Sequence, residues 1–110
     1  MAAKTKIAVL ISGTGTNMAA LLFASRLPGA NYEIILVASN NPDAEGLALA
    51  AAEGIATFAQ SHQGMERGAH DELMEQAVRQ AGADYIILAG YMRILSDSFV
   101  DRWNGRMLNI

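Results

Sequence analysis

Apolar runs separated by turns divide the chain into short predicted strands. Residues 7–11 and 84–89 are almost wholly apolar, which is the pattern of parallel strands buried on both faces. Residues 32–39, 55–59 and 107–110 are bounded by turn residues and predict three more strands. We therefore expect a five-stranded sheet, with the strand at 84–89 in its interior.

Helical patterns occupy the segments between these strands. The alanine-rich residues 44–53 end at Gly54, and residues 66–81 repeat apolar side chains at helical spacing before Gly82. Another helix follows the first strand, and Ser96 can cap a short helix before the last strand. This alternation predicts an α/β fold with a doubly wound, mainly parallel sheet and right-handed crossovers.

The helix predicted at residues 66–81 carries many of the chain's polar side chains. His70 and the loop residue His62 have no acidic or serine partner at a recognisable spacing, so we expect both to be solvated. The acidic residues are expected on a solvated face rather than in a metal cluster; they are Glu66, Asp71, Glu72 and Glu75. The apolar residues at helical spacing are Ala69, Leu73, Ala77 and Ala81.

A glycine turn of sequence SGTGTN, residues 12–17, joins the first strand to the first helix. Glycines at positions 13 and 15 permit backbone angles and close approaches that a side chain would block, and amides at a helix N-terminus face a ligand above the strand end. Asn17 suits either an N-cap or a direct ligand. The order of strand, glycine turn and helix predicts a phosphate site.

The residues around the turn narrow the choice of ligand. A dinucleotide site needs a third glycine, where this chain has Met18, and an acidic residue after the second strand, where it has SNN at 39–41. A P-loop ends in Gly-Lys-Ser/Thr, whereas this turn ends in Gly-Thr-Asn. A phosphate monoester held by amides and hydroxyls remains, and a tight turn that binds nothing is the alternative.

Ligands of open parallel sheets bind beyond the carboxyl ends of the strands. That rule predicts one functional rim, made of the glycine turn, the turn at Asn40, residues 90–95 and the strand end at Asn109.

Composition and charge exclude several classes of protein. The 110 residues fit one domain, residues 1–110, and a hydrophobic content of 52% is typical of a globular fold. The net charge of −3 argues against a nucleic-acid partner or an anionic-membrane surface, and no apolar stretch is long enough to span a bilayer. No cysteine is present, which excludes thiolate metal sites and fits a reducing compartment, so we expect the cytoplasm.

The sequence stops inside the strand predicted at residues 107–110, with no turn or cap after Ile110. We interpret the chain as the N-terminal part of a longer protein, truncated in its fifth strand; a short natural protein is the alternative. An open apolar strand edge promotes association, so self-association through this edge is a further expectation.

Three segments resemble the phosphoribosylglycinamide formyltransferase (glycinamide ribonucleotide transformylase) family. They are VLISGTGTN at residues 9–17, VASNNPDAEGLALAAAEGI at 37–55 and LAGYMRILSDSFVDRWNGRMLNI at 88–110. The family usually has serine where this chain has Thr16, and often phenylalanine where it has Tyr91. Both changes keep the hydroxyl or the aromatic ring. The resemblance implies a Rossmann-like formyltransferase N-terminal domain.

The resemblance also implies a reaction and a set of site residues. The reaction is transfer of a formyl group from the co-substrate 10-formyltetrahydrofolate to the amine of glycinamide ribonucleotide in purine synthesis, without a metal. Asn109 matches the catalytic asparagine and also contacts the folate. The implied phosphate-binding residues are Gly15, Thr16 and Asn17. The implied folate-binding residues are Arg67, Met92, Arg93, Ile94 and Leu95.

In this family the segment after Ile110 continues with His-Pro-Ser-Leu-Leu-Pro, and its histidine acts as general acid with the help of a later aspartate. Neither residue lies in the 110-residue sequence, so we expect this chain alone to be inactive. Two alternatives remain open. One is another folate-dependent enzyme, a methionyl-tRNA formyltransferase or a formyltetrahydrofolate deformylase, although the turn and the acidic charge argue against the tRNA enzyme. The other is a non-catalytic phosphate- or nucleotide-binding module.

Overall fold

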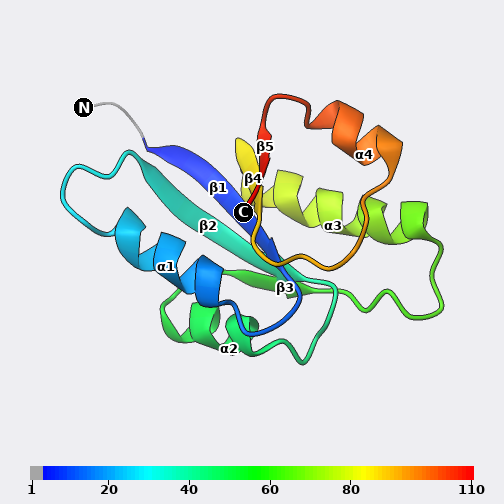
Figure 1. The fold of residues 1–110 in the computed structure, drawn as a ribbon, viewed down its shortest axis with the longest axis horizontal. Coiled ribbons are helices and arrows are strands. Elements are labelled where there is room, and N and C mark those ends of the chain that lie inside the picture. Colours follow the sequence, from blue (N-terminus) through cyan, green and yellow to red (C-terminus); the bar gives the residue numbers. More distant parts are fainter. Residues whose placement is uncertain (1–3) are drawn as a thin grey trace.

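The computed structural model describes residues 4–110, which alternate strands and helices as the apolar pattern predicts (Figure 1). The elements in chain order are β1 (Thr5–Ile11), α1 (Thr16–Ser25), β2 (Tyr32–Ser39), α2 (Glu45–Ala52), β3 (Thr57–Ala59), α3 (Arg67–Ala81), β4 (Tyr85–Leu88), α4 (Asp97–Arg102) and β5 (Met107–Asn109). The second strand has the predicted bounds, and the other predicted strands differ by a few residues at their ends.

The five strands form one parallel sheet in the order β3-β2-β1-β4-β5. The predicted doubly wound α/β fold is therefore confirmed, with β1 at the centre and β4 in the interior. All carboxyl ends of the strands point to the same edge, so the segments that follow β1, β2, β4 and β5 share one rim of the sheet.

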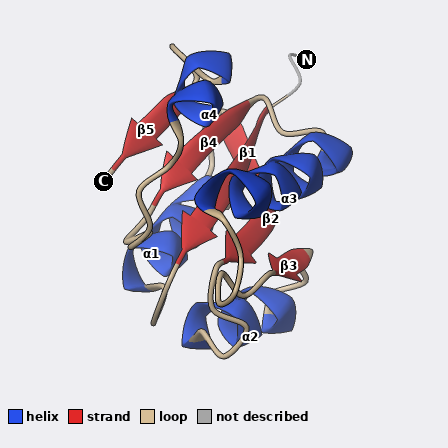
Figure 2. Ribbon diagram, turned by 90° about the vertical axis from the view of Figure 1, so that its right-hand side faces the viewer, coloured by secondary structure: helices blue, strands red, loops and turns tan. Residues whose placement is uncertain are grey.

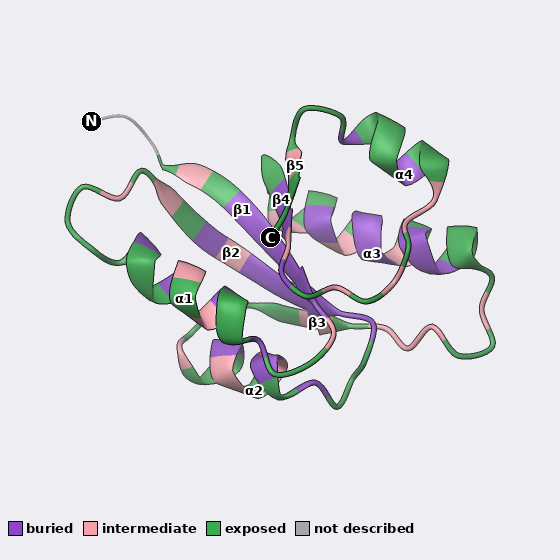
Figure 3. Ribbon diagram, in the orientation of Figure 1, coloured by how far each residue is buried: buried purple, intermediate pink, exposed green. Residues whose placement is uncertain are grey.

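Helices cover both faces of the sheet. In Figure 1, α1 and α2 lie on one side of the strands and α3 and α4 on the other, and Figure 2 shows the strands between them with α3 in front. Side chains alternate along β1: Val9 belongs to the core cluster that includes Met18 of α1, whereas Leu10 belongs to the cluster that includes Met74 of α3. Residues 7–11 of β1 are all buried, and Figure 3 shows that most of β1 and β2 is buried apart from their N-terminal ends.

Contrary to expectation, α3 buries two of its carboxylates. Asp71 is 1% exposed and Glu75 is 5% exposed, so the prediction that they lie on a solvated face was wrong. Glu75 accepts hydrogen bonds from Arg79, from Arg102 and from the Trp103 indole at 2.8–3.0 Å. Burial alone would raise the pKa of Glu75, but these donors outweigh it and lower the pKa.

No helix within residues 4–110 combines the length and the apolar character needed to cross a bilayer.

Candidate functional site

The glycine turn folds tightly against α2. Gly15 has φ of 76°, a conformation that favours glycine, and it is the N-cap of α1. A Cβ at Gly15 would lie 2.8 Å from the Cα of Gly46, and the Gly46 amide donates to the Gly13 carbonyl at 3.1 Å. Gly13 itself has no such crowding among the described residues, so the glycine requirement that we predicted for both positions falls on Gly15.

Asn17 lies inside α1 rather than at its cap. Helix α1 begins at Thr16, and its first backbone bond runs from the Ala19 amide to the Gly15 carbonyl. The amides of residues 16–18 therefore precede the helical ladder and point beyond its end. Gly15 occupies the N-cap position, so the N-cap role that we considered for Asn17 is wrong, and its role as a direct ligand stays a prediction.

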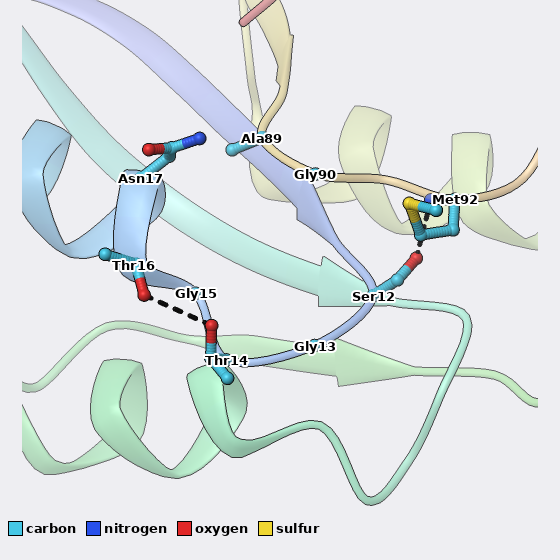
Figure 4. A pocket seen from close by; sticks show the side chains of 9 residues that line it. All are labelled: Ser12, Gly13, Thr14, Gly15, Thr16, Asn17, Ala89, Gly90 and Met92. Carbon is cyan, nitrogen blue, oxygen red and sulfur yellow. Dashed lines mark hydrogen bonds between the residues drawn. The ribbon is translucent and has the colours of Figure 1, made fainter.

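The turn and the segment after β4 enclose a cavity of about 310 Å³ (Figure 4). Its lining residues are Ser12, Gly13, Thr14, Gly15, Thr16, Asn17, Ala89, Gly90 and Met92. None of these residues carries a charge, and the Thr14 and Thr16 hydroxyls lie 3.1 Å apart. The cavity therefore offers neutral donors, namely backbone amides, hydroxyls and a carboxamide, which suits a small anionic group.

Ser12 connects the turn to two other segments of the rim. Its hydroxyl donates to the Asn40 carboxamide oxygen at 2.6 Å. The same hydroxyl accepts from the Met92 amide at 2.8 Å (Figure 4). The Asn40 side-chain nitrogen lies 3.2 Å from Nδ1 of His62. Ser12 was not among the site residues predicted from the sequence, although a polar residue directly after a buried strand was the available signal.

A second cavity, of about 440 Å³, lies beside the first and shares Met92 with it. Its lining residues are Leu88, Tyr91, Met92, Arg93, Ile94, Leu95, Val100, Met107 and Asn109. The fold thus brings residues 92–95 together with Asn109, which the sequence separates widely. Arg67 is exposed at the start of α3, and neither of these two cavities includes it.

Asn109 stands at the end of β5. It is exposed and pairs in register with Leu88, while the Ile110 amide donates to the Leu88 carbonyl at 3.0 Å. The strand pairing fixes the backbone on both sides of Asn109, and its carboxamide is free to meet a ligand in the second cavity.

Two residues that line the second cavity carry buried polar atoms without partners. The Tyr91 hydroxyl and Nε of Arg93 make no hydrogen bond within the described residues. Burial raises the pKa of Tyr91, and the Asp71 carboxylate adds to this effect while Arg93 opposes it. Asp71 also fixes the chain at Ser96, just after the residues that line the cavity, because its Oδ2 accepts from the Ser96 amide at 2.6 Å.

We expected both histidines to be solvated, and the burial of His70 shows that this prediction was wrong. His70 is fully buried, and its Nε2 donates to the Gln60 carbonyl at 2.7 Å. His62 is partly buried, and the two rings lie edge to face with centroids 6.2 Å apart. Burial disfavours the imidazolium and lowers the pKa of His70. No sequence pattern indicated this burial, because the partner of His70 is a backbone carbonyl.

Residues 4–110 contain no group of three or more histidine, aspartate or glutamate side chains that could hold a metal ion.

The chain is similar to proteins of known function over almost its whole length. The formyl transferase family profile matches residues 5–110. The chain is 44% identical over 108 residues to the trifunctional purine biosynthetic protein adenosine-3 of Gallus gallus, covering 97% of this chain and 11% of that protein. It is 39% identical over 105 residues to the phosphoribosylglycinamide formyltransferase of Escherichia coli (strain K12), covering 94% of this chain and 50% of that enzyme.

The fold agrees with these matches. The crystal structure of phosphoribosylglycinamide formyltransferase from Brucella melitensis superimposes with a TM-score of 0.90 at 40% identity, covering 96% of this chain and 56% of that one. The chain therefore spans about half the length of the single-function relatives and a small part of the trifunctional ones.

Proposed function

Because this chain belongs to the formyl transferase family, we propose that it supplies the phosphate- and folate-binding part of a phosphoribosylglycinamide formyltransferase. The reaction is transfer of a formyl group from 10-formyltetrahydrofolate to the amine of glycinamide ribonucleotide in purine synthesis. One observation carries this proposal: two neighbouring cavities share Met92, and Asn109 lines the second of them. The relatives described above favour this enzyme over the other folate-dependent enzymes and the non-catalytic module.

The glycinamide ribonucleotide phosphate binds in the first cavity. Gly15, Thr16 and Asn17 hold it through the amides at the start of α1, the threonine hydroxyl and the carboxamide. No charged side chain lines the cavity, so the helix N-terminus supplies the positive potential. This arrangement favours a phosphate monoester over a nucleoside triphosphate, which a lysine and a metal ion usually accompany.

The formyl donor fits the second cavity. A volume of about 440 Å³ lies in the range of small-molecule sites, and the exposed Ile94 and the partly buried Leu95 offer apolar surface to a flat ring. Main-chain groups of residues 92–95 offer polar contacts to its edge. Arg67 contacts the donor outside the cavity, a role that rests on the family resemblance alone.

Asn109 stabilises the charge that develops during transfer. The substrate amine attacks the formyl carbon, a new carbon–nitrogen bond forms, and the bond from that carbon to the donor nitrogen breaks. A proton leaves the attacking amine and another reaches the donor nitrogen. The Asn109 carboxamide donates a hydrogen bond to the formyl oxygen, where negative charge accumulates, and preorganised donors of this kind account for about 10²- to 10³-fold in rate.

No histidine, aspartate or glutamate lines either of these two cavities, so their described residues offer no general acid or base for proton transfer. The histidine and aspartate that the family uses are not in this sequence, so the chain alone binds substrates without transferring the formyl group. Formyl transfer by the purified 110-residue chain would contradict this part of the proposal.

Isothermal titration with glycinamide ribonucleotide, a mononucleotide and NAD tests the phosphate site. We expect the ribonucleotide to bind and NAD to bind at least about tenfold more weakly, a difference of about 1.4 kcal/mol. Asn17→Leu should weaken binding, whereas Asn104→Leu, which changes another exposed asparagine at the end of α4, should not. Selective binding of NAD, or equal effects of the two variants, would refute the proposed site.

We also propose a cytoplasmic setting and self-association through β5. The absence of cysteine supports the first. The position of β5 at the edge of the sheet, with Leu108 61% exposed, supports the second.

A further inference from the structure

We propose that Ser12 is a positioning residue that couples the phosphate turn to the folate-side segment, so that phosphate in the first cavity strengthens folate binding in the second. This inference rests on the function proposed above and adds a link between its two sites. The link is the Ser12 hydroxyl, which joins a side chain of the turn to the backbone of Met92, the residue that both cavities share.

The hydrogen bonds of Ser12 have defined directions. A hydroxyl has one proton, and Ser12 donates it to Oδ1 of Asn40 at 2.6 Å. The oxygen is then oriented to accept from the Met92 amide at 2.8 Å. Asn40 is 7% exposed and its other side-chain atom contacts His62, so the acceptor of the Ser12 proton is itself fixed. Ser12 can therefore fix the position of Met92 instead of moving freely with it.

Few other contacts hold the backbone of the folate-side segment, residues 90–96. Two of its amides donate to acceptors within the described chain, and both acceptors are side chains: Ser12 for Met92 and Asp71 for Ser96. Gly90, with φ of 73°, provides a turn just after β4. The backbone of the segment is thus attached through the amides of Met92 and Ser96, while the side chains of Tyr91 and Leu95 pack against the core. Residues 93–95 keep their amides available for a ligand.

Because of this arrangement, the position of Ser12 affects binding in both cavities. Ser12 directly precedes the glycines of the phosphate turn and lines the first cavity. A phosphate that orders the turn also orders Ser12, and the hydrogen bond to Met92 extends that order to the segment that lines the second cavity. A donor molecule then binds a segment that has already lost part of its freedom, which is positive coupling between the sites.

Folic acid and glycinamide ribonucleotide are suitable probes, because folic acid carries no formyl group. Titrations of the 110-residue chain with folic acid, with and without saturating ribonucleotide, measure the coupling directly. We expect the ribonucleotide to lower the apparent Kd for folic acid about fivefold in the unmodified chain and less than about twofold in Ser12→Ala. Ser12→Thr, which keeps the hydroxyl, should restore the coupling, and Ser98→Ala, a serine change in α4, should leave it intact.

Amide spectra of the ¹⁵N-labelled chain separate failure of the coupling from failure of the phosphate site. Ribonucleotide should shift the resonances of residues 15–17 in the unmodified chain and in Ser12→Ala alike, and should slow hydrogen exchange at Met92 in the unmodified chain. The exchange rate at Met92 shows whether the ribonucleotide orders the folate-side segment, even if Ser12→Ala does not fold.

Shifts at residues 15–17 without slower exchange at Met92, or equal coupling in Ser12→Ala and Ser98→Ala, would overturn the coupling alone. No response at residues 15–17 would overturn the phosphate site and the coupling together.

Discussion

At the scale of single residues, Gly15 is constrained by both its backbone and its neighbour. Its φ of 76° disfavours any side chain, and a Cβ would lie 2.8 Å from Gly46 of α2. Gly64 has the same φ of 76°, but a Cβ there would have no heavy atom within 4 Å, so Gly64→Ala measures the backbone effect alone. We expect Gly64→Ala to lower the free energy of unfolding by about 1 kcal/mol, and Gly15→Ala by about 1–3 kcal/mol more, because of the added crowding.

Urea unfolding of the two glycine variants and of the unmodified chain measures these differences. Equal losses for Gly15→Ala and Gly64→Ala would mean that the contact between the turn and α2 contributes nothing. Gly15→Ala should also weaken ribonucleotide binding, because displacement of the turn misdirects the amides of residues 16–18.

His70 makes stability depend on pH. Its pKa is lowered by burial, with Arg93 and His62 acting in the same direction and the Gln60 carbonyl and Asp71 opposing. The unfolded chain therefore takes up a proton near the ordinary pKa of about 6.5, before the folded chain does. Stability should be highest above that pH and should decrease as the pH falls below it, until the folded state is protonated as well.

Unfolding midpoints measured from pH 7.5 to 5.5 test this dependence. In His70→Phe the decrease between these pH values should be smaller than in the unmodified chain. His62→Gln should keep the decrease, because His70 is unchanged. Stability that rises on acidification in the unmodified chain would contradict the assignment.

At the scale of elements, Glu75 joins α3 to the C-terminal end of α4. Its carboxylate accepts from Arg79 on its own helix and from Arg102 and Trp103, and Arg79 and Arg106 lie over the Trp103 ring. Glu75→Ala leaves the buried indole N–H without a partner, so we expect a loss of about 2 kcal/mol in the free energy of unfolding. Glu72→Ala, on the exposed face of the same helix, should change stability by less than about 0.5 kcal/mol.

Thermal unfolding followed by Trp103 fluorescence reports on both glutamate variants. An equal loss for Glu72→Ala would show that removing any carboxylate from α3, and not breaking the link between α3 and α4, determines the result.

The elements and their approximate positions could be predicted because they depend on local sequence, although most strands differ by one or two residues at their ends. Short apolar runs separated by turns indicated the five strands. Ser96 caps α4 by accepting from the Phe99 amide, as expected. The buried face of α3 could not be predicted. It includes His70, Asp71 and Glu75, whose partners come from Gln60, Ser96 and Arg102. Burial of these polar groups becomes favourable only after distant segments supply their hydrogen bonds.

The candidate site also has one part that could be predicted from the sequence and one part that could not. The glycine turn is contiguous in sequence, so its strand-turn-helix order indicated a phosphate site, which stays a prediction. The contact from Ser12 to Met92 joins residues 80 positions apart and depends on the neighbouring positions of β1 and β4 in the sheet. No local pattern encodes such a contact, and for this reason Ser12 was not among the predicted site residues.

At the scale of the whole molecule, the two edges of the sheet differ in chemistry. β3 ends the sheet with Thr57 and Ala59 exposed, whereas β5 ends it with Leu108 61% exposed and Ile110, the next residue but one, 54% exposed. Leu108 also lines an apolar groove of about 310 Å³ with Tyr85 of β4. Open backbone groups beside apolar side chains favour strand pairing between chains, so the β5 edge is the expected site of self-association.

Sedimentation equilibrium over a range of concentrations tests this expectation. The apparent mass of the unmodified chain should rise with concentration, and Leu108→Lys should hold it at the monomer value, because a lysine on an edge strand opposes pairing. Leu27→Lys is the matched control, since Leu27 is 62% exposed but lies after α1, away from the sheet edge. If both lysine variants abolish association, added charge rather than the β5 edge explains the effect. If the unmodified chain stays monomeric throughout, the three residues of β5 offer too little edge to pair.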